Sequence, residues 1–495
     1  MNTITIHYIN SVYIKIDCER GIAKEINDFF AFKVPNYQFT PAFRNKLWNG
    51  EIHLFNLVNG YLYRGLLTHI LVFCKDRNYT IEFPNIPEYD IPTDLEIDTF
   101  LKSISISSGD KQISLYDHQI LAIRKSIQDK RVLLVSPTGS GKSLIIYFII
   151  KYLLKTLPKD KKILIIVPTT GLVAQMLHDF KDYSSGEMGK ECHVIYSGQE
   201  KVSTKRVVIS TWQSIYKQPE EYFNAFGGVI GDECHLFKAK SLTAIMTKLK
   251  DCDYRIGTTG TLDGTDVHKL VIEGLFGRVF SVTTTKDLID KDLLSQLKIE
   301  CLILQYPLDK VEEIKRAKYQ DELDWLVRNK ERNTFIKTLA HTLKGNTLLL
   351  FNFVEKHGMP LFRDIQKESN KKSYMICGNT LADDRERIRQ IVNKEDNCLL
   401  VASYGTCSTG INIKNIKNII FTSPSKSVIR VLQSIGRGLR KAEDKDMVTV
   451  YDIGDDLRHK KYRNHALRHL DDRIIIYTNE KFTFLKRLIR LGDNK

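Results

Sequence analysis

The sequence predicts an α/β protein in which two tandem parallel-sheet lobes follow a small α+β N-terminal domain. Short apolar runs alternate with helical patterns from about Ser114 onward, which is typical of parallel sheets covered on both faces. A second alternating series begins near Ile299. The first 90 residues lack this alternation and begin with two short strand patterns and a helix.

The length supports several domains. A chain of 495 residues is too long for one hydrophobic core, and its size suggests about three domains. We expect an N-terminal domain over residues 1–90, a proline-marked linker over 91–112, a first lobe over 113–290 and a second lobe over 291–495. The second lobe is expected to contain a charged helical insertion between Leu308 and Lys344, and a basic tail.

The charge balance indicates an acidic partner. The net charge is +15 and the isoelectric point is about 9.1, as expected for a protein that binds nucleic acid or another polyanion. Residues 1–90 carry nine basic and nine acidic residues, so the excess lies in the middle of the chain and the tail.

The nine cysteines are scattered without a Cys-x-x-Cys pair, which argues against a zinc site or a disulfide framework and favours a reducing compartment. The N-terminus does not resemble a signal peptide. The most apolar run, Leu144 to Leu154, is interrupted by Lys151 and is too short to cross a bilayer. We therefore expect a soluble cytoplasmic protein without a membrane partner.

The N-terminal domain combines strand and helix patterns with an aromatic stretch. The turn signal Asn59-Gly60 predicts a hairpin. The stretch from Tyr37 to Gly50 interleaves rings with Arg44 and Lys46, which could stack on bases. The alternative is that most rings fill a small core, and the neutral charge favours it. The expected elements are strands Thr3–Ile9, Val12–Ile16, Ile52–Leu57 and Tyr61–Tyr63, and helices Gly21–Phe32 and Leu66–Arg77.

The most informative stretch is Ser136–Ser143, which reads Ser-Pro-Thr-Gly-Ser-Gly-Lys-Ser. It follows an apolar strand pattern and precedes a helical one, the context of a phosphate-binding loop. Lys142 is expected to reach the terminal phosphates and Ser143 to place its hydroxyl on Mg²⁺, while the backbone of the loop approaches the phosphates. Ser136 stands where the strict pattern has glycine. The loop residues are Thr138, Gly139, Ser140, Gly141, Lys142 and Ser143.

An acidic pair follows another apolar strand pattern, Val229-Ile230. Asp232 at the strand end can hold Mg²⁺ through water, and Glu233 can polarise an attacking water. With the phosphate-binding loop, this pair indicates hydrolysis of a nucleoside triphosphate.

The segment Asp232-Glu233-Cys234-His235 resembles motif II of the superfamily-two helicases, and other segments resemble further motifs of that family in the same order. The resemblance implies two RecA-like lobes, with Gln119 recognising adenine, His235 in the ATP site, and Thr169, Thr170, Ser210 and Thr211 along the nucleic-acid track. The matching segments are Tyr116–Gln119 (glutamine motif), Pro168–Gln175 (motif Ia), Ser210–Gln213 (motif Ib) and Thr259–Thr261 (motif III, with Gly260 replacing alanine).

The second lobe carries the remaining motifs. Gln433–Arg440 resembles motif VI, in which two arginines three apart share a helix face. Such guanidinium groups can neutralise charge on a transferred phosphoryl group, so Arg437 and Arg440 are both finger candidates. Ser403–Asn412 resembles motif V, which implies nucleic-acid contacts for Ser403 and Thr409 and a nucleotide contact for Gly410. Leu348–Asn352 resembles motif IV.

Over essentially its whole length the chain resembles the UvsW family of phage recombination and repair helicases, on Thr211–Pro219, Asp232–His235 and the patch Phe39–Gly50. This resemblance implies an ATP- and Mg²⁺-dependent, DNA-stimulated motor that moves 3′ to 5′ on branched DNA such as recombination junctions, stalled forks and R-loops. It also implies a monomer that works with other replication or recombination proteins, in the host cytoplasm if phage-encoded.

Other functions remain open. A related motor could act on RNA or RNA–DNA hybrids, or track duplex DNA without separating strands. The chain could also anneal strands and use ATP only as a switch. The motif set disfavours a small-molecule kinase. In the tail, the basic groups His459–Arg463 and Lys486–Arg490 are expected on solvated helix faces, with DNA contact as the alternative.

Overall fold

The computed structural model describes residues 3–492 except 35–36, 110, 197, 238, 263–265, 369, 409–412, 414, 424–430, 432–433, 437, 440 and 442–444. The chain divides into two compact units. One unit combines residues 1–136 and 141–282, and the other combines residues 137–140 and 283–495. Each unit contains one seven-stranded sheet.

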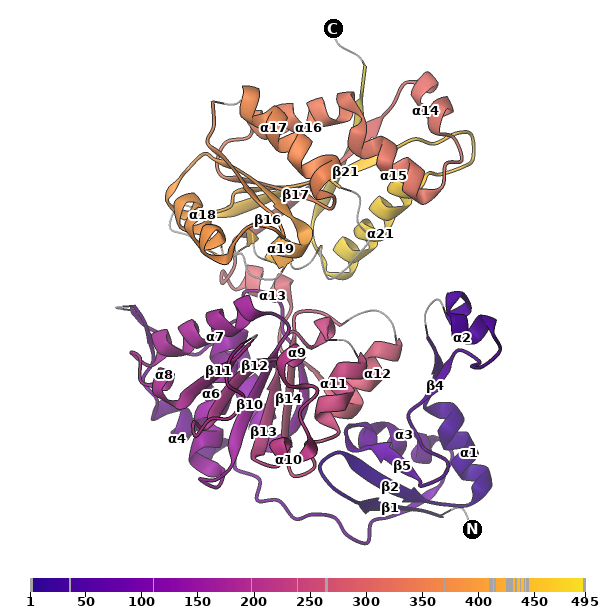
Figure 1. The fold of residues 1–495 in the computed structure, drawn as a ribbon, viewed down its shortest axis with the longest axis vertical. Coiled ribbons are helices and arrows are strands. Elements are labelled where there is room, and N and C mark those ends of the chain that lie inside the picture. Colours follow the sequence, from indigo (N-terminus) through magenta and orange to yellow (C-terminus); the bar gives the residue numbers. More distant parts are fainter. Residues whose placement is uncertain are drawn as a thin grey trace. The chain divides into compact units, whose positions relative to one another are not determined.

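The sheet of the first unit has the order β11-β12-β10-β13-β14-β9-β15, and all its neighbouring strands are parallel (Figure 1). Successive side chains of β10 point to opposite faces: Ile163 and Ile165 join one core, and Leu164 and Ile166 join the other. This two-sided burial explains the continuous apolar runs of the sequence. The strands are β9 Arg131–Val135, β10 Lys162–Val167, β11 Cys192–Ile195, β12 Val207–Thr211, β13 Phe226–Gly231, β14 Tyr254–Thr259 and β15 Val279–Ser281.

Helices cover both faces of this sheet (Figure 1). One core packs it against α4 to α7 and the other against α9 to α12. The helices are α4 Asp94–Lys102, α5 Asp117–Asp129, α6 Lys142–Thr156, α7 Thr170–Tyr183, α8 Met188–Glu191, α9 Trp212–Ile215, α10 Glu220–Phe223, η3 Cys234–Leu236, α11 Ala239–Met246 and α12 Asp266–Leu275, with a hairpin of β7 Ser107–Ser108 and β8 Lys111–Gln112. Throughout the described part of the chain, no helix has both the length and the apolar character of a membrane span.

The sheet of the second unit has the order β18-β19-β17-β20-β21-β16-β22. If the strands of each sheet are counted from one in chain order, both sheets read three-four-two-five-six-one-seven. The two α/β halves therefore share one topology, as expected for tandem RecA-like lobes. The strands are β16 Gln296–Gln305, β17 Thr347–Phe351, β18 Ser373–Ile376, β19 Leu399–Ser403, β20 Asn418–Phe421, β21 Met447–Asp456 and β22 Phe484–Arg490.

The predicted helical insertion between β16 and β17 is confirmed as α14 to α16. The tail differs from expectation, because its last basic group lies on β22, an edge strand that pairs with β16, and not on a helix face. The helices of this unit are α13 Thr285–Asp290, α14 Leu308–Ile314, α15 Tyr319–Arg328, α16 Lys330–Thr342, η4 Val354–Gly358, α17 Met359–Glu368, α18 Ala382–Lys394, α19 Tyr404–Ser408 and α21 His465–Asn479.

The N-terminal part has a small mixed sheet in the order β5-β2-β1-β6. Its first predicted hairpin is confirmed, since β1 and β2 pair antiparallel. The prediction of a hairpin around Asn59-Gly60 is wrong. Strand β4 pairs with β3 and strand β5 pairs with β2, so the turn joins strands of two different sheets. The elements are β1 Thr3–Tyr8, β2 Tyr13–Asp17, α1 Arg20–Phe29, β3 Ala31–Lys33, η1 Tyr37–Phe39, α2 Pro41–Arg44, β4 Glu51–His53, β5 Tyr61–Tyr63, η2 Arg64–Leu66, α3 Leu67–Asp76 and β6 Thr80–Glu82.

The described residues of the stretch 37–50, called the aromatic knob below, do not form a core. Neither η1 nor α2 buries any residue. Phe39 is 63% exposed, so the expectation that the rings fill a small core is wrong for it, and the neighbouring Leu47 is 81% exposed. A surface pocket of the knob is lined by Gln38, Phe43, Arg44, Lys46, Leu47, Trp48 and Asn49.

The N-terminal part is firmly attached to the first sheet's helices. A Cβ at Gly65 would lie 2.1 Å from the carbonyl oxygen of Glu273 in α12, so only glycine permits this approach. Ser11 donates its hydroxyl to Asp253 at 2.8 Å, and Arg64 donates to the same carboxylate at 3.3 Å. Arg131 of β9 donates to the carbonyl of Ser11 at 2.6 Å. These contacts place the aromatic knob on the same compact unit as the first sheet.

Candidate nucleotide-binding site

The loop after β9 has the backbone geometry that phosphate binding requires. Gly139 and Gly141 have φ of +91° and +85°, in the left-handed region that favours glycine. A Cβ at Gly141 would lie 2.2 Å from Nε2 of Gln119. α6 begins directly after Gly141, which has no side chain to cap it, so the backbone at this helix N-terminus suits an anion. The hydroxyl of Ser140 donates to the carbonyl of Pro137 at 2.7 Å.

Gln119, the expected adenine-recognising residue, is 3% exposed and lies beside this loop. Its Oε1 accepts a hydrogen bond from the backbone N–H of Tyr116 at 3.0 Å, in the first turn of α5. The structure therefore brings the glutamine motif and the phosphate-binding loop together.

Lys142 connects the loop with the acidic pair. Its Nζ donates to the carbonyl of Ser136 at 3.1 Å and lies 3.6 Å from Oε1 of Glu233. A Cβ at Gly260 would lie 3.7 Å from Nζ of Lys142, an ordinary van der Waals distance, so the alanine usual in motif III would also fit here. Three motifs distant in sequence thus meet at this lysine.

Asp232 lies at the end of β13 and is 8% exposed. One of its oxygens accepts hydrogen bonds from the hydroxyl of Thr258 at 2.6 Å and from the backbone N–H of Glu233 at 2.9 Å. Burial, and secondly the neighbouring Glu233 charge, raise the pKa of Asp232. A buried carboxylate under these conditions favours a nearby cation.

Glu233 adopts φ of +51°, a backbone conformation that costs a non-glycine residue about 1–3 kcal/mol and is typical of functional sites. Its Oε2 lies 3.5 Å from Nδ1 of His235. That nitrogen is also 2.6 Å from the hydroxyl of Thr259, which itself donates to the carbonyl of Thr261. Since the hydroxyl has one proton, Nδ1 of His235 carries a proton and donates it to Thr259, joining motif II to motif III.

The residues present suit Mg²⁺. Ser143 and Asp232 offer hydroxyl and carboxylate oxygens, the hard ligands that Mg²⁺ prefers, and Mg²⁺ commonly uses few protein ligands together with substrate phosphates. The hydroxyl of Ser143 lies 3.0 Å from the hydroxyl of Tyr183, at the last residue of α7. No motif marks Tyr183 in the sequence.

The expected nucleic-acid contacts of the first unit divide into two groups. Thr170 is exposed and Thr169 caps α7 by accepting from the N–H of Leu172. Ser210 has no exposed area and donates its hydroxyl to the carbonyl of Thr211, so its side chain cannot touch a ligand in this conformation. Thr211 is 4% exposed and bonded to Ser214. Thr169 and Thr170 therefore remain predicted contacts, whereas the side chains of Ser210 and Thr211 are buried in this conformation.

In the second unit, Ser403 lies at the end of β19, and its hydroxyl is 2.7 Å from that of Thr406 in α19. The predicted residues Thr409, Gly410, Arg437 and Arg440 lie outside the described residues.

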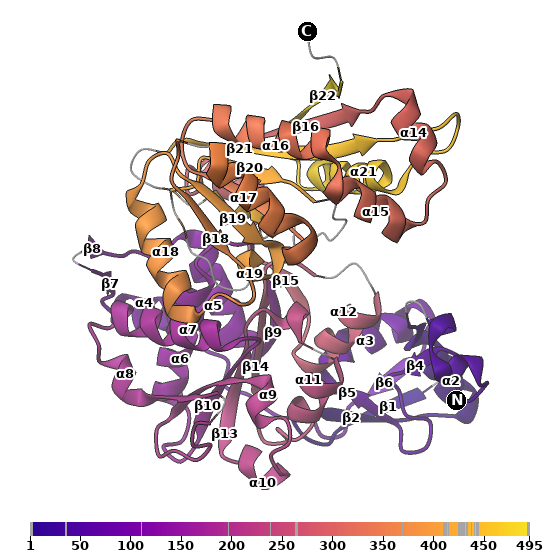
Figure 2. The ribbon, with the colours of Figure 1, turned by 45° about the horizontal axis from the view of Figure 1, so that its top comes forward.

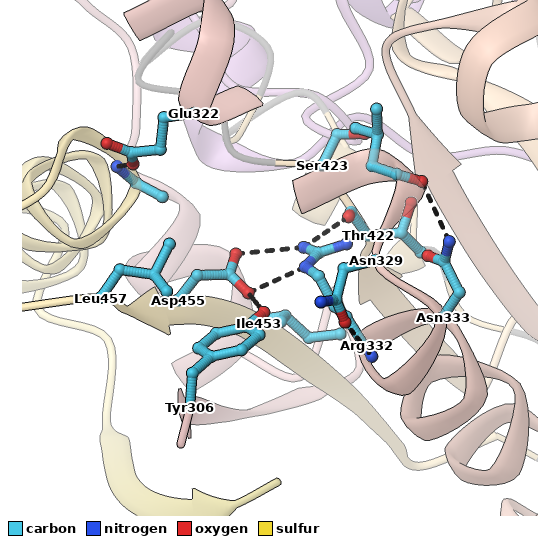
Figure 3. Close-up of polar contacts among 12 residues, drawn as sticks. Tyr306, Glu322, Asn329, Arg332, Asn333, Thr422, Ser423, Ile453, Asp455 and Leu457 are labelled. Carbon is cyan, nitrogen blue, oxygen red and sulfur yellow. Dashed lines mark hydrogen bonds and ion pairs between the residues drawn. The ribbon is translucent and has the colours of Figure 1, made fainter. Parts of the chain in front are cut away.

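The carboxyl edge of the second sheet contains a buried ion pair that the sequence does not indicate (Figure 3). Arg332 of α16 and Asp455 of β21 are both fully buried. Nε of Arg332 donates to Asp455 at 2.8 Å, and one of its NH groups donates to the carbonyl of Thr422 at 2.9 Å. The hydroxyl of Tyr306 donates to Asp455 at 2.7 Å. His357, also fully buried, contacts the hydroxyl of Ser423 at 3.1 Å.

Comparison with known proteins connects this geometry to a family. Residues 3–84 match the model "DNA helicase UvsW, N-terminal", residues 112–264 match "Type III restriction enzyme, res subunit", and residues 330–442 match "Helicase conserved C-terminal domain". The ATP-dependent DNA helicase uvsW of Enterobacteria phage T4 is 34% identical over 99% of this chain and 100% of that protein. The DNA 3'-5' translocase XPB2 of Sulfurisphaera tokodaii is 24% identical over 74% of this chain and 88% of that protein.

A solved structure agrees with the sequence comparison. The crystal structure of T4 UvsW matches with a TM-score of 0.53 and 32% identity, covering 99% of both chains.

Proposed function

This chain belongs to the UvsW family of superfamily-two helicases and is an ATP-dependent helicase; from this premise we propose that it moves 3′ to 5′ on DNA and remodels branched substrates such as recombination junctions, stalled forks and R-loops. Similarity to a protein named as a 3′–5′ translocase supports the polarity. The preference for branched DNA rests on the family resemblance and needs its own test.

The observation that carries the proposal is the meeting of Lys142 with Glu233 at 3.6 Å. We propose that Lys142 and the loop backbone hold the ATP phosphates, that Ser143 and Asp232 hold Mg²⁺, and that Glu233 orients the attacking water. The cation, when bound, neutralises charge on the phosphate oxygens. Arg437 and Arg440 are the proposed fingers that neutralise charge on the transferred phosphoryl group.

The contact between His235 and Thr259 gives the site a route to motif III. A change at Glu233 during hydrolysis would alter its interaction with His235, which donates to Thr259. We propose that this path carries the state of the nucleotide from motif II to motif III.

We propose that residues 1–90 form a DNA-binding domain through the aromatic knob. Exposed rings beside basic side chains suit stacking on bases and contact with phosphates. Phe39, Arg44 and Lys46 are exposed, and Trp48 is half-buried with its Nε1 donating to the carbonyl of Glu51. Because the N-terminal part is attached to the first sheet's helices, DNA held by the knob would move with the first sheet and its helices.

The knob is tested by comparing two double variants for binding to a forked duplex at several salt concentrations. Arg44→Ala/Lys46→Ala should weaken binding and lower the slope of log affinity against log salt by about two. Lys24→Ala/Lys75→Ala removes the same charge from exposed positions on α1 and α3 and should change little. Equal effects of the two variants would reject the knob as a DNA contact.

The motor is tested by ATP hydrolysis and strand displacement on forks, Holliday junctions, R-loops and linear duplexes with 3′ or 5′ tails, in wild type and Lys142→Ala. We expect DNA to stimulate turnover, the variant to be inactive, and 3′-tailed and branched substrates to be preferred. Preference for RNA or RNA–DNA hybrids, or ATP-driven tracking without displacement, would replace the proposed substrate class. Annealing that survives in Lys142→Ala would indicate a separate strand-annealing activity.

We further propose that the protein acts as a monomer in the cytoplasm, which is the host's if the chain is phage-encoded, beside other replication and recombination proteins. None of the nine cysteines, all within the described residues, is in a disulfide, which suits a reducing compartment. Residues 113–290 and 291–495 would serve as the two motor lobes. Most of the expected linker 91–112 is folded, because it forms α4 and the β7–β8 hairpin, and α4 packs on the first sheet.

A further inference from the structure

Helix α7 connects two parts of the proposed machinery. Its first residue is Thr170 and its last is Tyr183, so its 14 residues span about 21 Å. Thr169 and Thr170 at its start belong to motif Ia, and Gln213 of motif Ib donates to the carbonyl of Pro168 just before it. The start of α7 therefore brings the proposed contacts Thr169 and Thr170 of motif Ia together with Gln213 of motif Ib.

The end of α7 touches the proposed cation site. The hydroxyl of Tyr183 lies 3.0 Å from that of Ser143. The ring of Tyr183 packs edge-on against Tyr147, with centroids 5.5 Å apart, and Tyr147 follows Ser143 by four residues on the same face of α6. These contacts place Tyr183 beside the first turn of α6, the helix that begins at the phosphate-binding loop. Helices α6 and α7 lie side by side (Figure 2).

Packing fixes α7 between these two ends. Val173 and Phe180 have no exposed area and Met176 is 4% exposed, so one face of α7 is buried over most of its length. The last turn is also tied to the β7–β8 hairpin, because Asp182 accepts from the N–H of Gly109 at 3.0 Å. A closely packed helix held at several points moves as a body, so displacement at its start is transmitted to Tyr183.

The contact matters because of how a serine hydroxyl binds a cation. The hydroxyl has one proton, and its oxygen can face a cation only if that proton points elsewhere. Tyr183 oxygen can accept this proton, which leaves the lone pairs of Ser143 available for Mg²⁺. If Tyr183 donates instead, it occupies a lone pair of Ser143. The position of the Tyr183 hydroxyl therefore influences whether the lone pairs of the Ser143 oxygen can bind Mg²⁺.

Building on the proposed function, we propose that Tyr183 is a positioning residue for Ser143, and that α7 couples nucleic-acid contact at Thr169 and Thr170 to cation-dependent nucleotide binding. Nucleic acid bound at the start of α7 changes the position of the Tyr183 hydroxyl relative to the hydroxyl of Ser143. By reciprocity, nucleotide with Mg²⁺ changes the affinity for nucleic acid by the same factor.

The test measures binding of fluorescent ADP to the full chain, with Mg²⁺ or with EDTA, and with or without a forked DNA duplex. The variant is Tyr183→Phe, which keeps the ring and removes the hydroxyl. Tyr147→Phe is the matched control, because it removes a hydroxyl from the same aromatic cluster and leaves the Ser143 contact in place. Loss of one hydrogen bond predicts an affinity for ADP with Mg²⁺ that is about 2- to 10-fold weaker in Tyr183→Phe. Its affinity in EDTA should match wild type, and the effect of DNA on nucleotide affinity should shrink toward none.

The other outcomes separate the inference from the function on which it rests. Equal weakening in Mg²⁺ and EDTA, or a full DNA effect in Tyr183→Phe, overturns the role of Tyr183 while the motor stands. An equal loss in Tyr147→Phe assigns the effect to packing and also overturns it. If DNA leaves nucleotide affinity unchanged in wild type and also fails to stimulate ATP hydrolysis, both proposals fail.

Discussion

The two sheets share one strand order, but the buried carboxylates at their carboxyl edges have different partners. In the first sheet, Asp232 directly follows strand five and is next to a second carboxylate, Glu233. Nζ of Lys142 lies 3.6 Å from Oε1 of Glu233. In the second sheet, strand six ends at Asp455–Asp456, and Asp455 is neutralised by Arg332 from the helical insertion. At the first edge, the carboxylates lie beside the phosphate-binding loop. At the second edge, the carboxylate of Asp455 forms a buried ion pair with Arg332.

The helix N-termini follow the same contrast. α6 begins after Gly141, which has no side chain to cap it, whereas α21 begins under the carboxylate of Glu322, which accepts from the N–H groups of His465 and Ala466 at 2.9 and 2.7 Å. A carboxylate at a helix N-terminus occupies the position that a phosphate would take. At the first edge two carboxylates share one lysine, whereas at the second edge a buried arginine pairs with Asp455. The comparison teaches that one fold yields a ligand site or a structural core, depending on how far the chain neutralises its own buried charges.

The largest expected effect separates the two edges by activity. Glu233→Gln should lower ATP turnover by about 10²- to 10⁴-fold, the usual contribution of a general base, while nucleotide binding persists. Asp455→Asn removes a buried charge at the carboxyl edge of the second sheet and should affect stability more than the chemical step. Single-turnover hydrolysis and equilibrium ADP binding on both variants check this. A folded Asp455→Asn with the same loss of chemistry as Glu233→Gln would break the comparison.

The next effect concerns stability of the second unit. Arg332→Met leaves Asp455 as an uncompensated buried charge and should reduce the free energy of unfolding by about 3–5 kcal/mol. Adding Asp455→Asn should restore part of the loss, because the neutral amide no longer needs a counter-charge. Urea denaturation measures both, with Arg328→Met at an exposed position of α15 as the control, expected within about 0.5 kcal/mol of wild type. No recovery in the double variant would show that Arg332 acts mainly through packing.

A third prediction uses the pH dependence of the same edge. Burial, and secondly the Arg332 charge, lower the pKa of His357 to about 3 from its ordinary 6.5. Between these values the unfolded chain binds a proton that the folded chain does not, so stability falls as pH falls below 6.5. At about 1.4 kcal/mol per pH unit, this group should cost the second unit about 2 kcal/mol at pH 5 relative to pH 7. Urea midpoints at both pH values should differ less for His357→Gln, and an unchanged pH difference would contradict the neutral buried state.

These residues also show where sequence interpretation succeeds and where it ends. Most strands of both sheets coincide with apolar runs such as Lys162–Val167, because burial on two faces demands them. The meeting of Lys142 with Glu233 was expected from motif chemistry alone. Arg332 and Glu322 were not recognisable, because a charged residue on a helix looks solvated until its partner, more than 100 positions away, is placed.

Other differences have equally local causes. The strong turn signal Asn59-Gly60 gave a false hairpin, because each flanking strand finds its partner elsewhere. The basic residues of β22 resemble a helix face, because an edge strand exposed to solvent lacks a continuous apolar run. Tyr183 escaped notice because its role depends on a contact 40 positions away and on no local pattern.

The smallest predicted effect tests the helix N-terminus of the second unit. Glu322 is 3% exposed and accepts from His465, Ala466 and the side chain of Asn464, so its carboxylate caps α21. Glu322→Gln keeps the size but removes the charge and one accepting oxygen, and should cost about 1–2 kcal/mol in urea denaturation. Glu331→Gln, in the exposed first turn of α16, is the matched control and should cost a few tenths. If the two substitutions lower the free energy of unfolding equally, the Glu322 carboxylate does not stabilise the N-terminus of α21 in the way that a bound phosphate is proposed to stabilise that of α6.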